Sequence, residues 1–214
     1  MNDTGTDTPT DTDRSTDTGA AAPPSDYRLL LPNGWFRITL DPERRKAAVD
    51  ALVDRQFQGM DDAPHIKRMV RSELLGRAKE AYRNGGIELY ISLQTAGPLT
   101  IPASLLLTLV TPDRPGGTEL EALAQHLFDN GPLDQDVSIE ELQAGRAVRV
   151  RTRKVPEQND PSGNTAPVTT VDYHVGVPGS DSFLLLTFST PLDPLADAMV
   201  ELFDAVAHSL IWIG

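Results

Sequence analysis

The chain has 214 residues, with 19 Lys and Arg against 31 Asp and Glu, a formal net charge of −12 and no cysteine. The length fits one domain, and a hydrophobic content of 39% is enough to build a core. A sequence pI near 4.6 argues against nucleic acid as a partner, because binding to phosphates needs clustered positive charge. Without cysteine the chain can form no disulfide, thiolate metal site or cysteine nucleophile.

The first 25 residues contain seven Thr, five Asp and three Pro, and they contain no aromatic residue, Leu, Ile or Val. Such a segment cannot bury enough apolar surface to offset its loss of conformational entropy. Residues 1–25 are therefore expected to form a disordered tail in front of one domain at residues 26–214. The chain also lacks a secretory signal pattern and any run of 18 apolar residues, so we expect a cytoplasmic protein without a membrane span.

The first elements expected are a hairpin and two helices. Strands at residues 27–31 and 35–40 flank Pro32-Asn33-Gly34, and an Asn-Gly pair favours a tight hairpin turn. Asp41 and Pro42 then begin one helix, and a second helix runs from about residue 63 to residue 83. Basic residues gather on this second helix without sharing one clean face: Lys67, Arg68, Arg71, Arg77, Lys79 and Arg83.

The next segments are mostly strands. Alternation over residues 87–94 predicts a half-buried strand in which Glu88 belongs to the polar set, and the apolar run 104–111 predicts an interior strand. After a turn at residues 115–117, Thr118 and Glu121 match a capping box that begins another helix. The remaining expected elements are strands at 137–142, 146–155, 168–177 and 182–190, and a closing helix from Asp193 whose apolar stripe includes Leu202 and Phe203.

This order predicts an α+β fold in which an antiparallel sheet packs between helical layers. The opening YRLLLPNGWFRITL and the closing SFLLLTFSTPLDPLADAMVELFDAVAHSLIW resemble the ends of the PsbP-like superfamily. That superfamily includes photosystem PsbP subunits, Ran-binding Mog-type proteins and small bacterial lipoproteins, although this chain has no lipidation cysteine. The resemblance covers residues 27–40 and 168–213, and it implies a sandwich fold and a non-enzymatic protein. It transfers no functional residue.

No motif for catalysis or for a cofactor stands out in the sequence. His65, His126, His174 and His208 are dispersed, and no His-Glu-x-x-His, phosphate-binding glycine loop or Gly-x-Ser-x-Gly is present. Ordinary surface or capping roles are therefore expected for the histidines. We expect a protein that is not an enzyme and that holds neither a metal nor a cofactor.

The sharpest local pattern is on the strand expected at residues 146–155. Arg149, Arg151 and Arg153 share one face of it at spacings of roughly 7 Å. Guanidinium groups suit carboxylate and phosphate, so this arginine row could dock an acidic partner, helped by a mobile loop at residues 156–167. The alternative is internal pairing: if Val155 lies opposite Val168, then Arg151 meets Asp172 and Arg149 meets His174.

The sequence thus predicts a non-catalytic protein-interaction module, an accessory subunit of a larger assembly or secretion system. Its candidate partner-binding residues are Arg149, Arg151, Arg153, Asp172 and His174. One alternative is a small-molecule binder with a pocket between the sheet and the first two helices, which a deep apolar cavity would favour. The other is a hydrolase assembled from Asp, Glu and His, which a buried carboxylate–histidine pair would favour.

Overall fold

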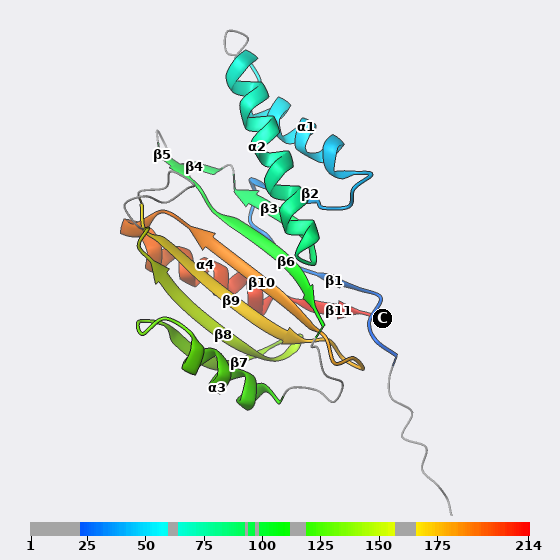
Figure 1. The fold of residues 1–214 in the computed structure, drawn as a ribbon, viewed down its shortest axis with the longest axis vertical. Helices are drawn as coiled ribbons and strands as arrows, with labels where there is room; N and C mark the ends of the chain where they lie inside the picture. Colours follow the sequence, from blue (N-terminus) through cyan, green and yellow to red (C-terminus); the bar gives the residue numbers. More distant parts are fainter. Residues whose placement is uncertain (1–21, 60–63, 93, 97–98, 112–118, 157–165) are drawn as a thin grey trace, which may run out of the picture.

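A computed structural model describes residues 22–59, 64–92, 94–96, 99–111, 119–156 and 166–214. Its main element is a seven-stranded antiparallel sheet in the order β2-β3-β6-β10-β9-β8-β7 (Figure 1). These strands are β2 (Trp35–Thr39), β3 (Gly86–Ser92), β6 (Ser104–Val110), β7 (Asp136–Leu142), β8 (Gly145–Lys154), β9 (Val168–Gly176) and β10 (Phe183–Thr190). In two small ribbons, β1 (Asp26–Arg28) pairs with β11 (Ile211–Ile213) and β4 (Gln94–Ala96) pairs with β5 (Leu99–Ile101).

Helices cover both faces of the sheet (Figure 1). On one face, α1 (Arg45–Gln56) and α2 (Pro64–Arg83) pack near β2 and β3, and α3 (Leu120–Asn130) contacts β7 and β8. On the other face, α4 (Ala196–His208) packs against β9 and β10 and is preceded by a short 3₁₀ turn, η1 (Asp193–Leu195). The predicted α+β class, with an antiparallel sheet between helical layers, is therefore confirmed.

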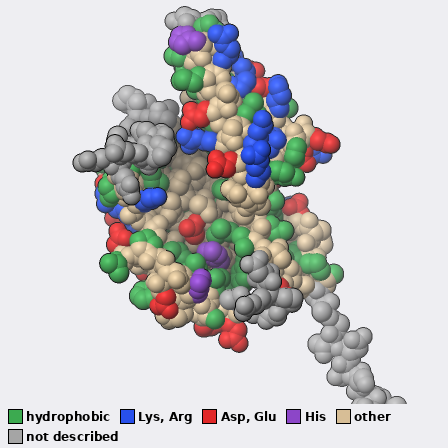
Figure 2. Space-filling view, in the orientation of Figure 1, with side chains coloured by type: hydrophobic (Ala, Val, Ile, Leu, Met, Phe, Trp, Pro, Cys, Tyr) green, Lys and Arg blue, Asp and Glu red, His purple; other side chains and the backbone are tan. Residues whose placement is uncertain are grey.

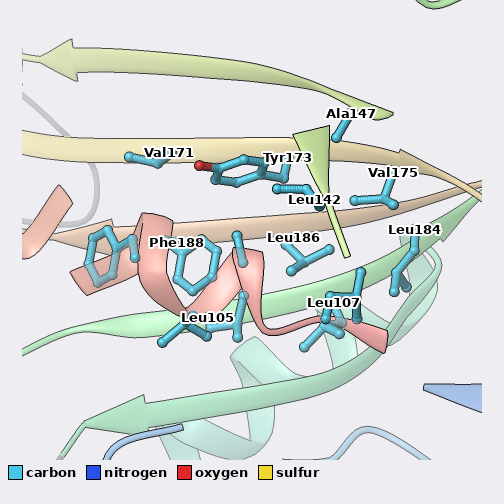
Figure 3. Packing of buried hydrophobic residues seen from close by; sticks show 14 of the residues in the cluster. Leu105, Leu107, Leu142, Ala147, Val171, Tyr173, Val175, Leu184, Leu186 and Phe188 are labelled. Carbon is cyan, nitrogen blue, oxygen red and sulfur yellow. The ribbon is translucent and has the colours of Figure 1, made fainter. Parts of the chain in front are cut away.

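The larger core lies between the sheet and α4. Alternate residues of the central strands point into it because successive side chains of a strand face opposite sides (Figure 3). The rings of Phe188 on β10 and Phe203 on α4 stack with centroids 5.0 Å apart. The buried sheet residues of this core include Leu105, Leu107, Val171, Tyr173, Val175, Leu184, Leu186 and Phe188.

A second, smaller core lies between β2 and the two helices α1 and α2. Its fully or almost fully buried members are Ile38, Leu40, Val49, Leu52, Val53 and Ala78. Asp41 begins the turn ahead of α1, where its Oδ1 accepts hydrogen bonds from the backbone N–H groups of Glu43 and Arg44 at 2.8 and 3.3 Å. The helix therefore begins later than expected: Asp41 caps a turn at residues 42–44, and α1 starts at Arg45 with Arg44 as its N-cap.

The predicted first hairpin is wrong. The chain does turn at Gly34, whose φ is +87°, but the two flanking strands do not pair with each other. Instead β1 pairs with β11, with Tyr27 opposite Trp212, and β2 pairs with β3. A turn signal reports only local backbone conformation, and here pairing with strands distant in sequence wins over the local hairpin.

Some expected features fall outside the described residues: the turn at 115–117, Thr118 of the capping box, most of the loop 156–167 and residues 1–21 of the tail. At the inner end of the tail, the backbone N–H of Ser25 donates to the carbonyl of Ile213 at 2.9 Å. Ordered pairing therefore starts one residue before the predicted boundary at residue 26. No helix within the described ranges is long and apolar enough to cross a membrane.

Candidate functional site

The arginine row of β8 lies on the face of the sheet that α4 covers. Arg149 is only 8% exposed, and its Nε and Nη2 donate to the two carboxylate oxygens of Asp204 at 2.9 and 3.0 Å. The hydroxyl of Tyr173 donates to the same carboxylate at 2.7 Å. A bidentate, charge-assisted contact of this kind is strong and directional, so it joins α4 to strands β8 and β9.

The other two arginines of the row are also paired within the chain. Arg151 donates to Asp197 of α4 at 2.6 Å, and Arg153 donates to both oxygens of Asp193 at 2.6 and 3.0 Å. The prediction that the three arginines share one face is confirmed, and they are internally paired. An acidic partner that docks on this row would have to displace these carboxylates.

The partners predicted for the row on β9 are wrong. Val150 lies opposite Asp172 and Val148 lies opposite His174, one residue away from the register expected from Val155 and Val168. A shift of one residue moves every side chain to the other face of the sheet. Asp172 and His174 therefore face away from the arginine row.

Asp172 and His174 lie on the face shared by α1, α2 and α3. The two helical groups leave the middle of this face hollowed, and acidic and histidine side chains are visible there between α2 and α3 (Figure 2). Both residues line a cavity of about 220 Å³ between β8, β9 and the end of α3. His126 of α3 lines the same cavity, so the fold brings together two of the four dispersed histidines.

Burial controls the protonation of both strand residues. Desolvation raises the pKa of Asp172 above its ordinary value, and a hydrogen bond with Thr187 opposes that rise in part. Its Oδ1 is out of reach of solvent and has no hydrogen-bond partner among the described residues. Desolvation lowers the pKa of His174, which favours the neutral imidazole at neutral pH.

Helix α2 carries a basic face that the sequence did not resolve. Lys67 and Arg71 turn toward α1, where each pairs with an aspartate at 2.7 Å, and Arg77 pairs with Glu73 at 2.6 Å. The other three cations, Arg68, Lys79 and Arg83, are exposed and form no ion pair within the described part of the chain.

The three unpaired cations of α2 lie close together around the helix. At 3.6 residues per turn, Arg68, Lys79 and Arg83 fall within roughly 60° of one another. A row of basic side chains along α2 is visible on the face shown in Figure 2. The six basic residues of α2 share no common face, but the three that form no ion pair with described residues share one. The sequence alone does not tell the paired residues from the unpaired ones. We call Arg68, Lys79 and Arg83 the α2 stripe.

Glu88 is a polar residue whose burial the sequence missed. The alternating pattern of residues 87–94 predicts that Glu88 lies on the polar side of a half-buried strand, yet the residue is only 8% exposed. It pairs with Arg37 of β2 and accepts a hydrogen bond from the hydroxyl of Tyr90 at 2.7 Å. Tyr27 of β1 and Trp212 of β11 line the same cavity as Glu88, so strands from the two ends of the domain border this side of β3.

A larger cavity, of about 480 Å³, lies beside the ribbon of β1 and β11. Its walls include Tyr27, Glu88, Leu109 and Trp212. The pocket expected between the sheet and the first two helices corresponds only to a smaller cavity of about 200 Å³ at the edge of β2 and α1. The larger cavity therefore lies elsewhere than the expected small-molecule pocket. It borders the ribbon of β1 and β11, and the pairing of these two strands was not predicted from the sequence.

Two features of a hydrolase site can be checked among the described residues. These residues contain no group of three His, Cys, Asp or Glu side chains that could hold a metal ion. Asp172 and His174 are neighbours on one strand, but the only hydrogen bond that influences the pKa of Asp172 comes from Thr187. The carboxylate–histidine pair that would favour a hydrolase is not formed by these two residues.

Comparison with known proteins gives similarities of fold. No protein-family model matches the chain, and no curated protein sequence does so either. Solved structures similar to it include the Ran-binding protein Mog1p of Saccharomyces cerevisiae, with 13% identity over 59% of this chain and 78% of that chain and a TM-score of 0.40. Another is LpqN, involved in cell envelope biogenesis of Mycobacterium tuberculosis, with 13% identity over 92% and 88% and a TM-score of 0.46.

One of these solved structures is a Mog-type protein, the kind of protein that the two ends of the sequence resemble. At this level of identity the likeness concerns the arrangement of helices and strands, and it assigns no role to any residue of this chain.

Proposed function

We propose that the chain is a non-catalytic protein-interaction module that docks an acidic segment of a protein partner on the α2 stripe. The observation that carries this proposal is a row of three exposed cations that form no ion pair with the described residues, in a chain of net charge −12. Every arginine of the β8 row, in contrast, already contacts a carboxylate. A carboxylate of a partner therefore interacts most favourably with the α2 stripe, where it displaces no carboxylate of the chain.

The position of α2 supports the same proposal. Only Ala78 of its 20 residues is buried, so most of the helix surface is available to a partner. A positive stripe on an acidic molecule attracts an acidic segment and repels partners with exposed cations, which orients the encounter. Because the stripe is exposed, salt should weaken this binding strongly.

The β8 row remains a second surface for the same class of partner. The side chains of Arg151 and Arg153 are 35% and 47% exposed, so an acidic segment could compete for them with Asp197 and Asp193. The absence of cysteine supports a cytoplasmic setting. We propose that the protein acts there as an accessory subunit of a larger assembly or secretion system.

The test is affinity capture with the full chain and two charge-reversal variants. In the first, the stripe is reversed by Arg68→Glu, Lys79→Glu and Arg83→Glu. In the matched control, Arg28, Arg44 and Arg55, all exposed and outside the stripe, are changed to Glu, which gives the same net charge. We expect the first variant to bind the captured partner at least about tenfold more weakly than the control, with the difference shrinking at high salt. Equal binding by the two variants would remove α2 as the docking surface.

The 480 Å³ cavity supports a second candidate function, binding of a small apolar molecule. Its volume lies in the usual range for ligand pockets, and it combines apolar walls with two carboxylates, those of Asp26 and Glu88. A neutral fluorescent probe such as N-phenyl-1-naphthylamine should brighten in the presence of the protein and lose this response in Leu109→Lys. Leu133→Lys is the control, since Leu133 is fully exposed and does not line this cavity. An equal response in both variants would reject the pocket.

A further inference from the structure

The cavity beside α3 contains a carboxyl group whose charge is not balanced. Asp172 is half-buried in its wall, and the described residues that line the cavity include neither Lys nor Arg. Among the described residues, burial and the hydrogen bond with Thr187 control its protonation equilibrium, and no cation contributes to it. An ionised carboxylate in such a place is costly unless a cation or a hydrogen-bond donor reaches it. The cavity therefore favours a ligand that brings positive charge.

The other walls agree with a cationic ligand. Asn130 and Gly131, at the C-terminal end of α3, line the cavity, and this end of a helix carries partial negative charge. His174 is neutral at neutral pH because burial lowers its pKa, so it offers an acceptor nitrogen and no repelling charge. Leu127 and Val150 supply apolar surface for the stem of a ligand.

The acceptors select among cations. A divalent metal is disfavoured because Asp172 is the only carboxylate among the described lining residues. A bidentate guanidinium contact uses both oxygens of one carboxylate, and Asp172 already bonds Thr187. An ammonium group has three donors that can reach separate acceptors, and Asp172, His174 and Thr152 supply them. Rotation about the soft terminal torsion of Asp172 can turn its unpartnered oxygen toward the cavity.

We infer that the cavity between α3, β8 and β9 binds an alkylammonium group, either that of a free primary amine or that of a lysine side chain. Asp172 supplies the countercharge, His174 and Thr152 accept the remaining N–H donors, and the apolar walls contact the methylene stem. This site is separate from the α2 stripe and is selective for the opposite charge. Loss of partner docking on α2 would leave it unchanged.

The experiment is an NMR titration of the full ¹⁵N-labelled chain. One arm uses n-butylammonium chloride with n-butanol as the uncharged analogue. The other arm uses Nα-acetyl-lysine methylamide with the norleucine compound as the analogue. We expect saturable shifts of the backbone amides of Val150, Asp172 and His174 with the ammonium ligands, and no such shifts with the analogues. Response to butylammonium alone would assign the site to free amines, and response to the lysine compound would extend it to lysine side chains.

Two variants make the inference falsifiable. Asp172→Asn removes the charge and keeps the shape, so the amine should bind at least about tenfold more weakly. Asp129→Asn removes an exposed charge from the same helix that borders the cavity, and it should bind as the wild type does. A dispersed spectrum of Asp172→Asn confirms that it is folded. Equal affinity of the two variants, or no saturable shift in the wild type up to the solubility limit, would overturn the inference.

Discussion

Two ionisable residues on neighbouring strands, one buried and one half-buried, differ in whether an opposite charge lies beside them. Arg149 on β8 is 8% exposed and is held by both oxygens of Asp204. Asp172 on β9 has one oxygen without a hydrogen-bond partner among the described residues, and none of those residues places a cation beside it. The first charge is compensated within the chain, so removing either partner of the pair should be costly. The second is not, so it marks a place where the fold gives up stability.

Asp172→Asn should stabilise the chain at neutral pH. The folded-state pKa of Asp172 is raised above the ordinary value of 3.8, so between these values the folded chain holds more protons than the unfolded chain. Stability therefore falls as the pH rises through that window, and the asparagine variant avoids this loss. Thermal melts from about pH 4 to pH 7 should show a gain in Tm that grows with pH. A variant that is less stable than the wild type at pH 7 would contradict the sign.

Arg149→Ala should be strongly destabilising, by about 3 kcal/mol, because it leaves Asp204 without its main partner. The lower end of the range for buried pairs applies, since the side chain of Asp204 is still 30% exposed. Arg151→Ala is the control, and it should lose less than about 1 kcal/mol because its partner Asp197 is 87% exposed. Urea unfolding of both variants measures the difference, and similar losses would mean that the Arg149 pair is not special.

At the scale of elements, α2 and α4 use the same kind of structure differently. Helix α4 buries six of its 13 residues, and its stripe fills the main core. Helix α2 buries one of its 20 residues, although its apolar positions also recur at helical spacing. The difference follows from position, since α4 spans the middle of the sheet and α2 lies over its edge strands (Figure 1). A helix with so little buried surface is free to serve as a docking surface.

Phe203→Ala in α4 should cost about 3–5 kcal/mol, because the ring is fully buried and stacks on Phe188. Phe128→Ala in α3 is the matched control. Its ring is 59% exposed, so the loss should stay below about 0.5 kcal/mol. Chemical denaturation of both variants gives the comparison. A negligible effect at Phe203 would mean that the α4 stripe does not form the core.

At the scale of the whole molecule, the two ends of the domain are joined. The ribbon of β1 and β11 pairs residues 26–28 with residues 211–213, and the bond from Ser25 to Ile213 extends it. Tyr27 and Trp212 pack against the main core from this ribbon. The folded domain therefore includes Ser25, and the N-terminal tail ends before this residue.

Deletion of residues 1–21 should leave the fold intact and shift Tm by no more than about 2 °C, since those residues include no core-forming side chain. Deletion of residues 1–28 also removes β1 and exposes apolar surface of β11, so it should lower Tm by several degrees more, roughly 5 °C or above. Calorimetry of the two truncations separates these cases. A large loss from the shorter deletion would show that the tail packs on the domain.

The sequence alone determined the features that depend on local period. Alternation over residues 146–155 and 168–177 placed Arg149, Arg151 and Arg153 on one face and put Asp172 with His174, because the pleat of a strand needs no knowledge of its neighbours. The closing helix and its buried Phe203 followed from helical spacing in the same way.

Only the tertiary structure decided which elements meet. The partner of β1, the register between β8 and β9 and the pairing of Arg149 with Asp204, 55 residues away, depend on contacts between distant parts of the chain. A local pattern assigns a side chain to a face, but it cannot say what covers that face. The candidate sites follow from that distinction, since the fold covers the arginine row, leaves the α2 stripe open and places Asp172 in a cavity whose described lining residues include neither Lys nor Arg.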